Sequence, residues 1–312
     1  MYDCISIGSS LVDIFISSKD LETDRNKQQH VLTYGDKLDL NDFHIFTGGG
    51  ASNTSVALAR LGYKTAVISE TGHDEFSDLI VRDFEREGVS TQLLIREKLE
   101  RTGGSVLLVT KGGDRVAMTH RGAASMLDPY DIPSFWLTQA SWVHLSSIAG
   151  QKNTLLKIFN SLIKDQDTKL SWNPGKSEIE LLVNRTFDLD KIPCEVFFVN
   201  QQEWLLLAEV QEEILAHFPQ VIVTMGKKGG EVYLYGKKKF IYEGQSGSAV
   251  DNTGAGDSFA AAYIAALLDN RKVEEAIVWG VRNASSVVRF YGGKTGLLRR
   301  NQMLELLAVQ KK

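Results

Sequence analysis

The sequence contains the stretch Asp251-Asn252-Thr253-Gly254-Ala255-Gly256-Asp257, which runs directly into the Ala-rich segment Ser258 to Ala265. The Ala-rich segment predicts a helix, so the free N–H groups of its first turn would face the glycine loop. Gly254 and Gly256 let the backbone approach a ligand closely, and free amides at the positive end of a helix dipole bind phosphate. The stretch therefore predicts a phosphate site at the start of this helix.

Asp257 is the unusual member of this stretch, because a carboxylate beside a bound phosphate repels it. That cost is explained if the carboxylate accepts a proton from a hydroxyl group that attacks the phosphorus. The alternative is an N-terminal Asp cap on a structural helix. The motif as a whole favours a general base.

Composition limits the possible classes of protein. The chain has 312 residues, of which 43% are hydrophobic and 24% charged, as is ordinary for a globular protein with a large core. A net charge of −4 gives no electrostatic basis for binding nucleic acid. Cys4 and Cys194 lie in or next to apolar runs, which indicates small core residues rather than disulfides. Without a signal-peptide pattern or a membrane-length apolar window, we expect a cytoplasmic protein with no membrane contact.

Short apolar runs alternate with amphipathic stretches along the chain. The expected strands are 4–7, 66–69, 142–145, 170–172, 196–199 and 221–225. The expected helices are 51–61, 75–87 with Gly88 as C-terminal cap, 154–164 and 204–217, the last with room for a break. This alternation implies an α/β fold with a mainly parallel sheet, helices on both faces and a site at the carboxyl ends of the strands.

Two regions break the alternation. Residues 12–18 and 30–40 are expected to be extended, and residues 105–110 and 115–120 to form a hairpin around Lys111-Gly112-Gly113-Asp114. Neither region has a helix of its own. We interpret them as a small β-layer that covers a ligand, with an antiparallel extension of the main sheet as the alternative.

A second glycine cluster, Gly48-Gly49-Gly50-Ala51-Ser52-Asn53-Thr54-Ser55, leads into the first expected helix. Backbone without side chains would let a polar ligand lie against the chain, and Asn53 supplies both a donor and an acceptor. A glycine-rich turn that starts a helix explains this cluster alone equally well. Together with the later loop, it predicts a two-part ligand site.

The two clusters, in this order, resemble the two signatures of the PfkB/ribokinase family of carbohydrate kinases. Residues 49–55 resemble the first signature, and residues 251–257 resemble its D-T-x-G-A-G-D element. Between them, Asn200 to Glu203 resembles the N-x-x-E element, and 224–230 and 120–123 resemble further family elements. The resemblance spans essentially the whole chain.

The resemblance implies a ribokinase-like three-layer α/β/α core with a mainly parallel sheet, plus a small β-sheet lid. We expect the core to comprise residues 1–12, 41–96 and 121–312, and the lid residues 13–40 and 97–120. It also implies an ATP-dependent kinase that transfers the γ-phosphate to a hydroxymethyl oxygen of a sugar or sugar derivative. A homodimer through the lid is a further expectation.

The resemblance also implies roles on the acceptor side. Asp257 would be the catalytic base, and the amides of Gly254, Ala255 and Gly256 would form the anion hole. Asp13, at the end of the first strand, would bind substrate hydroxyls, with Gly49, Gly50 and Asn53 beside it.

On the donor side, Thr224, Gly226 and Gly229 would lie against the nucleotide, and Asn283 near the adenine. Asn200 and Glu203 would organise Mg²⁺ largely through water, because this ion gives up its water reluctantly. Asp251 and Thr253, with carbonyls of residues 291–294, would hold a monovalent cation such as K⁺.

Some positions depart from the family pattern. Asn252 stands where the motif usually has Thr, Asn173-Pro174-Gly175 replaces an Asp-Pro-Asn-like string, and residues 144–147 contain no carboxylate. These departures leave the substrate open. A nucleoside kinase is the alternative, with Phe15, Phe43, Phe46 and Tyr34 as candidates for a base slot. A non-catalytic sensor of sugars or nucleosides is the remote alternative.

Other nucleotide-binding motifs fail on spacing. Gly293-Lys294-Thr295 lacks the glycine that a P-loop needs at position 288, where Val288 stands. Gly8-Ser9-Ser10-Leu11 after the first strand is not the G-x-G-x-x-G of a dinucleotide-binding fold. His120-Arg121 is followed by Gly122 rather than by the Asp of a protein-kinase loop, and no His/Cys cluster indicates zinc.

Overall fold

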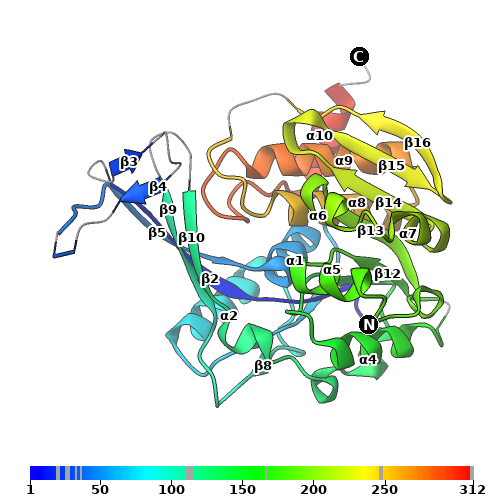
Figure 1. Cartoon of the computed structure of the whole chain (residues 1–312), viewed down its shortest axis with the longest axis horizontal. Helices are drawn as coiled ribbons and strands as arrows, with labels where there is room; N and C mark the ends of the chain where they lie inside the picture. The colour runs from blue at the N-terminus through cyan, green and yellow to red at the C-terminus, as the bar shows by residue number, and fades with distance from the viewer. Residues whose placement is uncertain are drawn as a thin grey trace.

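A computed structural model of the chain describes residues 1–18, 22–24, 29–31, 34–35, 37–109, 115–165, 167–245 and 249–309. Its main sheet has eight strands: β1 (Cys4–Ile7), β6 (Thr65–Ile68), β11 (Trp142–Leu145), β12 (Lys169–Trp172), β13 (Cys194–Asn200), β14 (Gln220–Thr224), β15 (Gly230–Leu234) and β16 (Lys237–Tyr242). Their order is β16-β15-β14-β13-β12-β11-β1-β6 (Figure 1). All six predicted strands are present, with ends shifted by at most two residues.

The strands from β6 to β14 pair in parallel, whereas β15 and β16 add an antiparallel edge. Because the six parallel strands point the same way, all of them deliver their carboxyl ends to one edge. Ser9, Ser146, Asn173, Asn200 and Thr224 end or follow these strands. The site described below lies at this edge, as expected for such a sheet.

Helices cover both faces of the sheet. One face carries α3 (Ser134–Leu137), α4 (Lys152–Leu162), α5 (Lys176–Val183), α6 (Gln201–Leu206) and α7 (Gln211–His217). The other carries α1 (Gly50–Arg60), α2 (Glu75–Glu87), α8 (Ala255–Leu268), α9 (Val273–Val287) and α10 (Arg300–Val309). Three short 3₁₀ turns, Gly122–Ser125, Pro129–Asp131 and Leu189–Lys191, lie in the connections, and a fourth, Gly226–Lys228, follows β14.

Alternate side chains of each strand enter different cores, which explains the two helical layers. In β13, Phe197 and Val199 belong to the α4–α7 side, and Val196 and Phe198 to the α1/α8 side. The predicted three-layer α/β/α architecture is confirmed. None of the helices in the described ranges is long and apolar enough to cross a membrane.

A second sheet, which we call the lid, stands beside the core (Figure 1). It contains β2 (Leu11–Ser17), β5 (Asp42–Gly48), β9 (Gly104–Val109) and β10 (Arg115–His120), in the order β10-β9-β2-β5. The expected hairpin is present as β9 and β10, and its connection, residues 110–114, lies outside the described residues. Two small pairs complete the β-structure: β3 (Glu22–Asp24) with β4 (Gln29–Val31), and β7 (Glu70–Thr71) with β8 (Ile95–Arg96).

The lid differs from the sequence prediction at two boundaries, the first of which is the start of β2 at Leu11 rather than at residue 13. Strand β5 pairs antiparallel with β2 over its whole length, so residues 42–48 belong to the lid and not to the core. Apolar side chains stand on both faces of β5, with Phe43 and Ile45 opposite Phe46, and this hides the alternation of a half-buried strand. Of the expected extended segment 30–40, only the end of β4 is a strand, and residues 32, 33 and 36 lie outside the described residues.

Candidate active site

The glycine loop before α8 has the geometry of an anion cradle. Gly254 precedes the helix with a φ of 74°, which favours glycine, and no side chain caps the helix start. Within the described chain, the amides of Gly254 and Gly256 donate to no protein acceptor, whereas Ala255 N donates to Asn252 O at 3.3 Å. The expected set of three free amides is therefore corrected to Gly254 and Gly256.

Asp257 lies in the first turn of α8 and borders the same cavity as this loop. Asn53 Nδ2 donates to Asp257 Oδ2 at 2.8 Å. Burial raises the pKa of Asp257 to about 6, the bond from Asn53 opposes that rise, and the charge of Asp13 adds to it. A carboxylate with this pKa is ionised at neutral pH and is a stronger base than an ordinary Asp.

The first glycine cluster packs against the end of β1. Gly49 has a φ of 96°, and Gly50 N donates to Ser9 Oγ at 3.2 Å. A Cβ on Gly50 would lie 2.5 Å from Ser146 Oγ and 3.8 Å from Asp257 Oδ1. Asn53 follows in the first turn of α1, and its Oδ1 is buried without a hydrogen-bond partner in the described chain. Gly50 and Asn53 thus lie next to Asp257, and Gly49 lies against Ser9 at the end of β1.

Asp13 lies inside β2 and not at the end of the first strand, which corrects its expected position. It is 7% exposed and accepts a hydrogen bond from Ser105 Oγ on β9. A Cβ on Gly48 would lie 2.2 Å from Asp13 Oδ2, so glycine is required beneath this carboxylate. The charge of Asp13 also contributes to the raised pKa of Asp257.

Asn200 and Glu203 form a capping box at the start of α6. Glu203 N donates to Asn200 Oδ1 at 2.9 Å, and Asn200 N donates to Glu203 Oε2 at 2.8 Å. Both residues line one cavity with Thr224, Asp257 and the 254–256 loop. Burial raises the pKa of Glu203, its bonds with Asn200 oppose the rise, and the charge of Asp257 adds to it. Glu203 and Asp257 therefore border one cavity, and the expected Mg²⁺ role of Asn200 and Glu203 stays a prediction.

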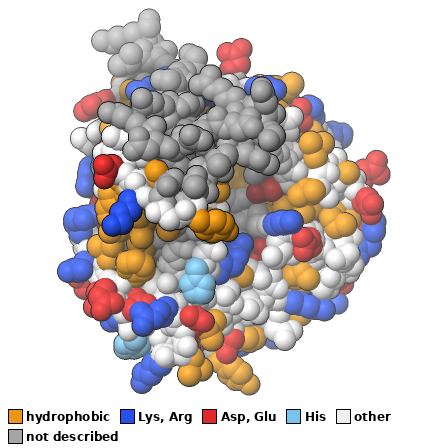
Figure 2. All heavy atoms as spheres, turned by 60° about the vertical axis from the view of Figure 1, so that its left-hand side comes forward, with side chains coloured by type: hydrophobic (Ala, Val, Ile, Leu, Met, Phe, Trp, Pro, Cys, Tyr) orange, Lys and Arg blue, Asp and Glu red, His pale blue; other side chains and the backbone are white. Residues whose placement is uncertain are grey.

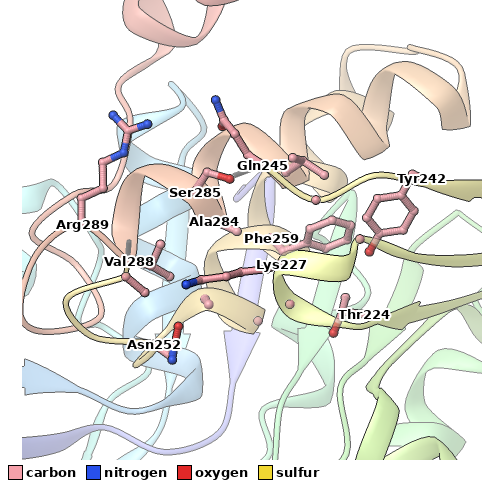
Figure 3. Close-up of a pocket in the computed structure, with 17 residues that line it drawn as sticks. Thr224, Lys227, Tyr242, Gln245, Asn252, Phe259, Ala284, Ser285, Val288 and Arg289 are labelled. Atoms are coloured by element: carbon pink, nitrogen blue, oxygen red, sulfur yellow. The ribbon is translucent and has the colours of Figure 1, made fainter. Parts of the chain in front are cut away.

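A pocket between β14, β16 and α9 continues from this cavity (Figure 3). Thr224, Gly226 and Gly229 line it, as expected for the nucleotide side. Figure 3 shows Lys227 extending across the pocket toward Val288 and Asn252. The rings of Tyr242 and Phe259 stack at 5.8 Å between centroids and form an apolar wall.

The expected contact of Asn283 with adenine is wrong. Asn283 is fully buried, its Nδ2 donates to Ser258 O at 2.9 Å, and its Oδ1 accepts from Leu298 N at 3.0 Å. The pocket is instead lined by Val281, Ala284 and Ser285 on a neighbouring stripe of α9, and by Val288 directly after the helix. Residues at this spacing of three and four lie on one helix face, and residue 283 does not belong to that face.

Asp251 and Thr253 make contacts that brace the loop. Asp251 Oδ1 accepts from Thr253 N at 3.0 Å and Oγ1 at 2.7 Å, and Asp251 Oδ2 accepts from Gly292 N at 3.0 Å. Lys294 O and Tyr291 O, two of the carbonyls expected near a cation, accept from Arg60 and Thr295. No group of three or more His, Cys, Asp or Glu in the described ranges has the arrangement of a metal site. A cation role of Asp251 and Thr253 stays a prediction.

Comparison with known proteins agrees with this geometry. The model of the pfkB family carbohydrate kinases matches residues 4–299. The chain belongs to this family. Its expected class, an ATP-dependent carbohydrate kinase, is confirmed by this membership.

Individual relatives within the family have different names. The chain is 28% identical over 288 residues to a ribokinase of Haemophilus influenzae, covering 88% of this chain and 91% of the relative. It is 25% identical over 267 residues to a nucleoside kinase of Methanocaldococcus jannaschii, covering 84% and 85%. The crystal structure of that archaeal nucleoside kinase superposes with a TM-score of 0.81 at 21% identity over 98% of each chain, which confirms the ribokinase fold.

The positions that depart from the family pattern now have a structural account. Glu178 brings a buried carboxylate to the region of residues 144–147, where it accepts from Ser147 Oγ, Ile148 N, Gly150 N and Gly175 N. These four donors make it a support for two loops rather than a substrate contact. Asn173 Nδ2 donates to Phe198 O at 3.0 Å and lines the cavity of Asp257.

Several further residues line the pocket between β14, β16 and α9 and are not among the site residues predicted from the sequence. They are Lys227, Tyr242, Gln245, Phe259, Val281, Ala284, Ser285, Val288 and Arg289. The stripe on α9 could have been found from its helical period, because small and apolar residues repeat at the spacing of one face. Tyr242 and Gln245 gave no local signal, since they reach the pocket only through pairing of the edge strands.

Proposed function

We propose that this enzyme transfers the γ-phosphate of ATP to a hydroxymethyl oxygen of a sugar or sugar derivative, with Asp257 as the general base. The observation that carries the proposal is the position of Asp257. Its carboxylate is held by Asn53 and lies beside the free amides of Gly254 and Gly256 at the start of α8. A base next to an anion cradle is the arrangement that in-line phosphoryl transfer needs.

Each side of the site contributes a separate action. Asp13, Gly49, Gly50 and Asn53 bind and orient the acceptor, and Asp257 removes the proton from its attacking hydroxyl. The amides of Gly254 and Gly256 stabilise negative charge on the transferred group. Thr224, Gly226 and Gly229 accommodate the nucleotide phosphates, with Lys227 near them.

Asn200 and Glu203 fit a Mg²⁺ ion bound through water and nucleotide oxygens, because they border the cavity together with Asp257. Bound there, Mg²⁺ would supply charge neutralisation for the phosphate oxygens. K⁺ at Asp251 and Thr253 would act on the loop rather than on the reacting groups. Replacing KCl by tetramethylammonium chloride in the assay tests that role.

A coupled ADP-release assay with ATP and Mg²⁺ tests the proposal against sugars, sugar phosphates, sugar acids and nucleosides. Asp257→Asn is the matched control, and its turnover should fall by about 10²–10⁴-fold or more while ATP binding persists. Near-wild-type turnover of that variant removes the base role. Ligand binding without turnover of any acceptor would instead favour the sensor hypothesis.

A nucleoside kinase is the second candidate, favoured by an aromatic cluster on the inner face of the lid. Phe15 packs on Phe46 at 5.5 Å and on Tyr291 at 5.8 Å, and His44 stacks on Tyr291 at 5.9 Å. Phe43 and Tyr34, two of the expected slot residues, are instead 57% and 104% exposed. The nucleoside arm of the assay separates the two candidates.

The expected homodimer through the lid is also a proposal. Phe43, Ile45, Val116 and Met118 on the outer face of the lid are 41–57% exposed. Figure 2, in which the lid side comes forward, shows apolar side chains among charged ones. Light scattering of the wild type and of Phe43→Glu tests it, because a lid dimer should dissociate when the charge is introduced. Location in the cytoplasm stays a prediction.

A further inference from the structure

A buried lysine lies behind the site and takes no part in the chemistry described above. Lys294 is 7% exposed, and its Nζ donates to Thr47 Oγ1 at 2.9 Å, Ser52 Oγ at 2.6 Å and Asp83 Oδ2 at 2.8 Å. Three acceptors use the full donor capacity of a lysine. They belong to β5 of the lid, to α1 and to α2, so one ammonium group joins three elements at one point.

The backbone next to this lysine separates two parts of the active site. A Cβ on Gly293 would lie 2.7 Å from Asn53 Nδ2, and a Cβ on Gly254 would lie 2.6 Å from Gly293 Cα. Residue 293 is therefore wedged between the amide that holds Asp257 and the first residue of the anion cradle. A shift of this loop would change the distance between base and cradle.

Strand β5 holds the same loop from both of its faces. On the inner face, the ring of Phe46 lies on Gly292, where a Cβ would be 2.8 Å from Phe46 Cγ. On the outer face, Thr47 accepts from Lys294. Arg60 adds a third attachment, because its guanidinium donates to Lys294 O at 2.8 Å while it is bound to Glu87 of α2.

We propose that Lys294 is a positioning residue for phosphoryl transfer: by fixing residues 292–294 to α1, α2 and the lid, it sets the position of Asn53 and Asp257 relative to the anion cradle. The inference rests on the proposed function, because it assigns Lys294 to the geometry of that reaction. A buried ion pair generally contributes little to the free energy of unfolding, but it can fix the relative position of the elements that it joins.

The variant Lys294→Met keeps the length of the side chain and removes its charge and donors. A misplacement of about 1 Å in a positioned site costs roughly 100-fold in rate, so kcat should fall by about that factor. KM for ATP should change by less than about threefold, since the attachment points of Lys294 lie outside the nucleotide pocket. Steady-state kinetics with the best acceptor from the panel measure this split.

Lys294→Met also leaves Asp83 buried beside Thr47 without its cation, and we expect this alone to lower the stability of the variant. The double variant Asp83→Asn/Lys294→Met removes both charges and should recover the melting temperature while kcat stays low. Arg300→Met is the matched control, because it breaks the ion pair with Asp269 at 2.7 Å far from the site. It should lower stability and leave kcat unchanged.

The outcomes separate the inference from the function on which it rests. A wild-type enzyme without turnover on any acceptor contradicts the proposed function. If the wild type is active and the double variant has the same kcat, only the role of Lys294 is contradicted. A single variant with raised KM for ATP and unchanged kcat also overturns it, because the residue would then act on nucleotide binding.

Discussion

The acceptor half and the donor half of the site use glycine for different reasons. On the acceptor half, a Cβ on Gly48, Gly50 or Gly293 would lie 2.2–2.7 Å from Asp13, Ser146 or Asn53. On the donor half, a Cβ on Gly226 or Gly256 would meet nothing within 4 Å. The protein itself requires the first set, and a φ of 57° explains Gly226, whereas only a bound ligand gives a reason for Gly256. The acceptor half is thus tightly packed at these glycines, whereas the donor half is mixed. Gly229 and Gly254 are crowded, with Cβ positions 1.8 Å from Tyr242 O and 2.6 Å from Gly293 Cα, but Gly256 lies at an open surface that can receive a ligand.

The largest expected effect comes from filling a crowded position. Gly293→Ala places a methyl group against Asn53 Nδ2 and should displace the amide that holds Asp257. We expect kcat to fall by roughly 100-fold, as for other displacements of about 1 Å, together with a lower melting temperature. Coupled-assay kinetics and thermal unfolding measure the two effects.

Gly256→Ala is the matched control on the donor half. Its methyl group enters open space in a helix, so the melting temperature should stay at the wild-type value or rise. KM for ATP should increase, because the same space receives phosphate. Equal destabilisation of the two variants would contradict the difference between the halves.

The second effect tests the donor half directly. Ala284→Phe places a ring in the pocket stripe of α9 and should raise KM for ATP by about tenfold or more, the effect of losing roughly 1.4 kcal/mol of binding. KM for the acceptor should not change, since α9 does not border the Asp13 side. Asn283→Ala, one residue earlier, should instead lower the melting temperature, because it leaves Ser258 O and Leu298 N without their partner. If Asn283→Ala, and not Ala284→Phe, raises KM for ATP, then Asn283 acts on nucleotide binding after all.

The third effect concerns the pH dependence of the base. The pKa of Asp257 is raised to about 6, and the base must be ionised to accept a proton. The value of kcat/KM for the acceptor should therefore fall about tenfold per pH unit below pH 6 and be level above it. Asn53→Ala removes a bond that favours the carboxylate, so the acid limb should move to higher pH. If kcat/KM of the wild type begins to fall only near pH 4, burial does not raise the pKa of Asp257.

The sequence predicted the parts of both halves that are encoded locally. Glycines at 49, 50, 254 and 256 mark positions where backbone meets a ligand or a neighbour, and such positions can be recognised from a short motif. Strand β5 is hard to predict because its two faces carry apolar side chains, and Asn283 differs by one residue from the face of α9 that lines the pocket. The contacts of the Lys294 side chain could not be predicted from the sequence, since its three partners lie 211–247 residues away in the chain.

The smallest effect on catalysis is expected outside both halves, at Glu70 on β7. Glu70 is 2% exposed, its Oε2 has no hydrogen-bond partner in the described chain, and burial raises its pKa to about 8, with smaller effects from Asp131 and Glu97. Because the folded state holds this proton more tightly than the unfolded state, the stabilisation is complete below about pH 4.5 and is lost as pH rises through about 8.

Glu70→Gln cannot ionise, so this pH dependence should disappear from its free energy of unfolding. Above pH 8 the variant should be more stable than the wild type, and kcat should be unchanged because residue 70 touches neither half of the site. Urea unfolding at pH 5 and pH 9 measures the first effect, and the coupled assay the second. Parallel stability curves for the two proteins would show that Glu70 is not protonated in the fold. A loss of kcat in this variant would show that Glu70 on β7 also supports the acceptor half of the site.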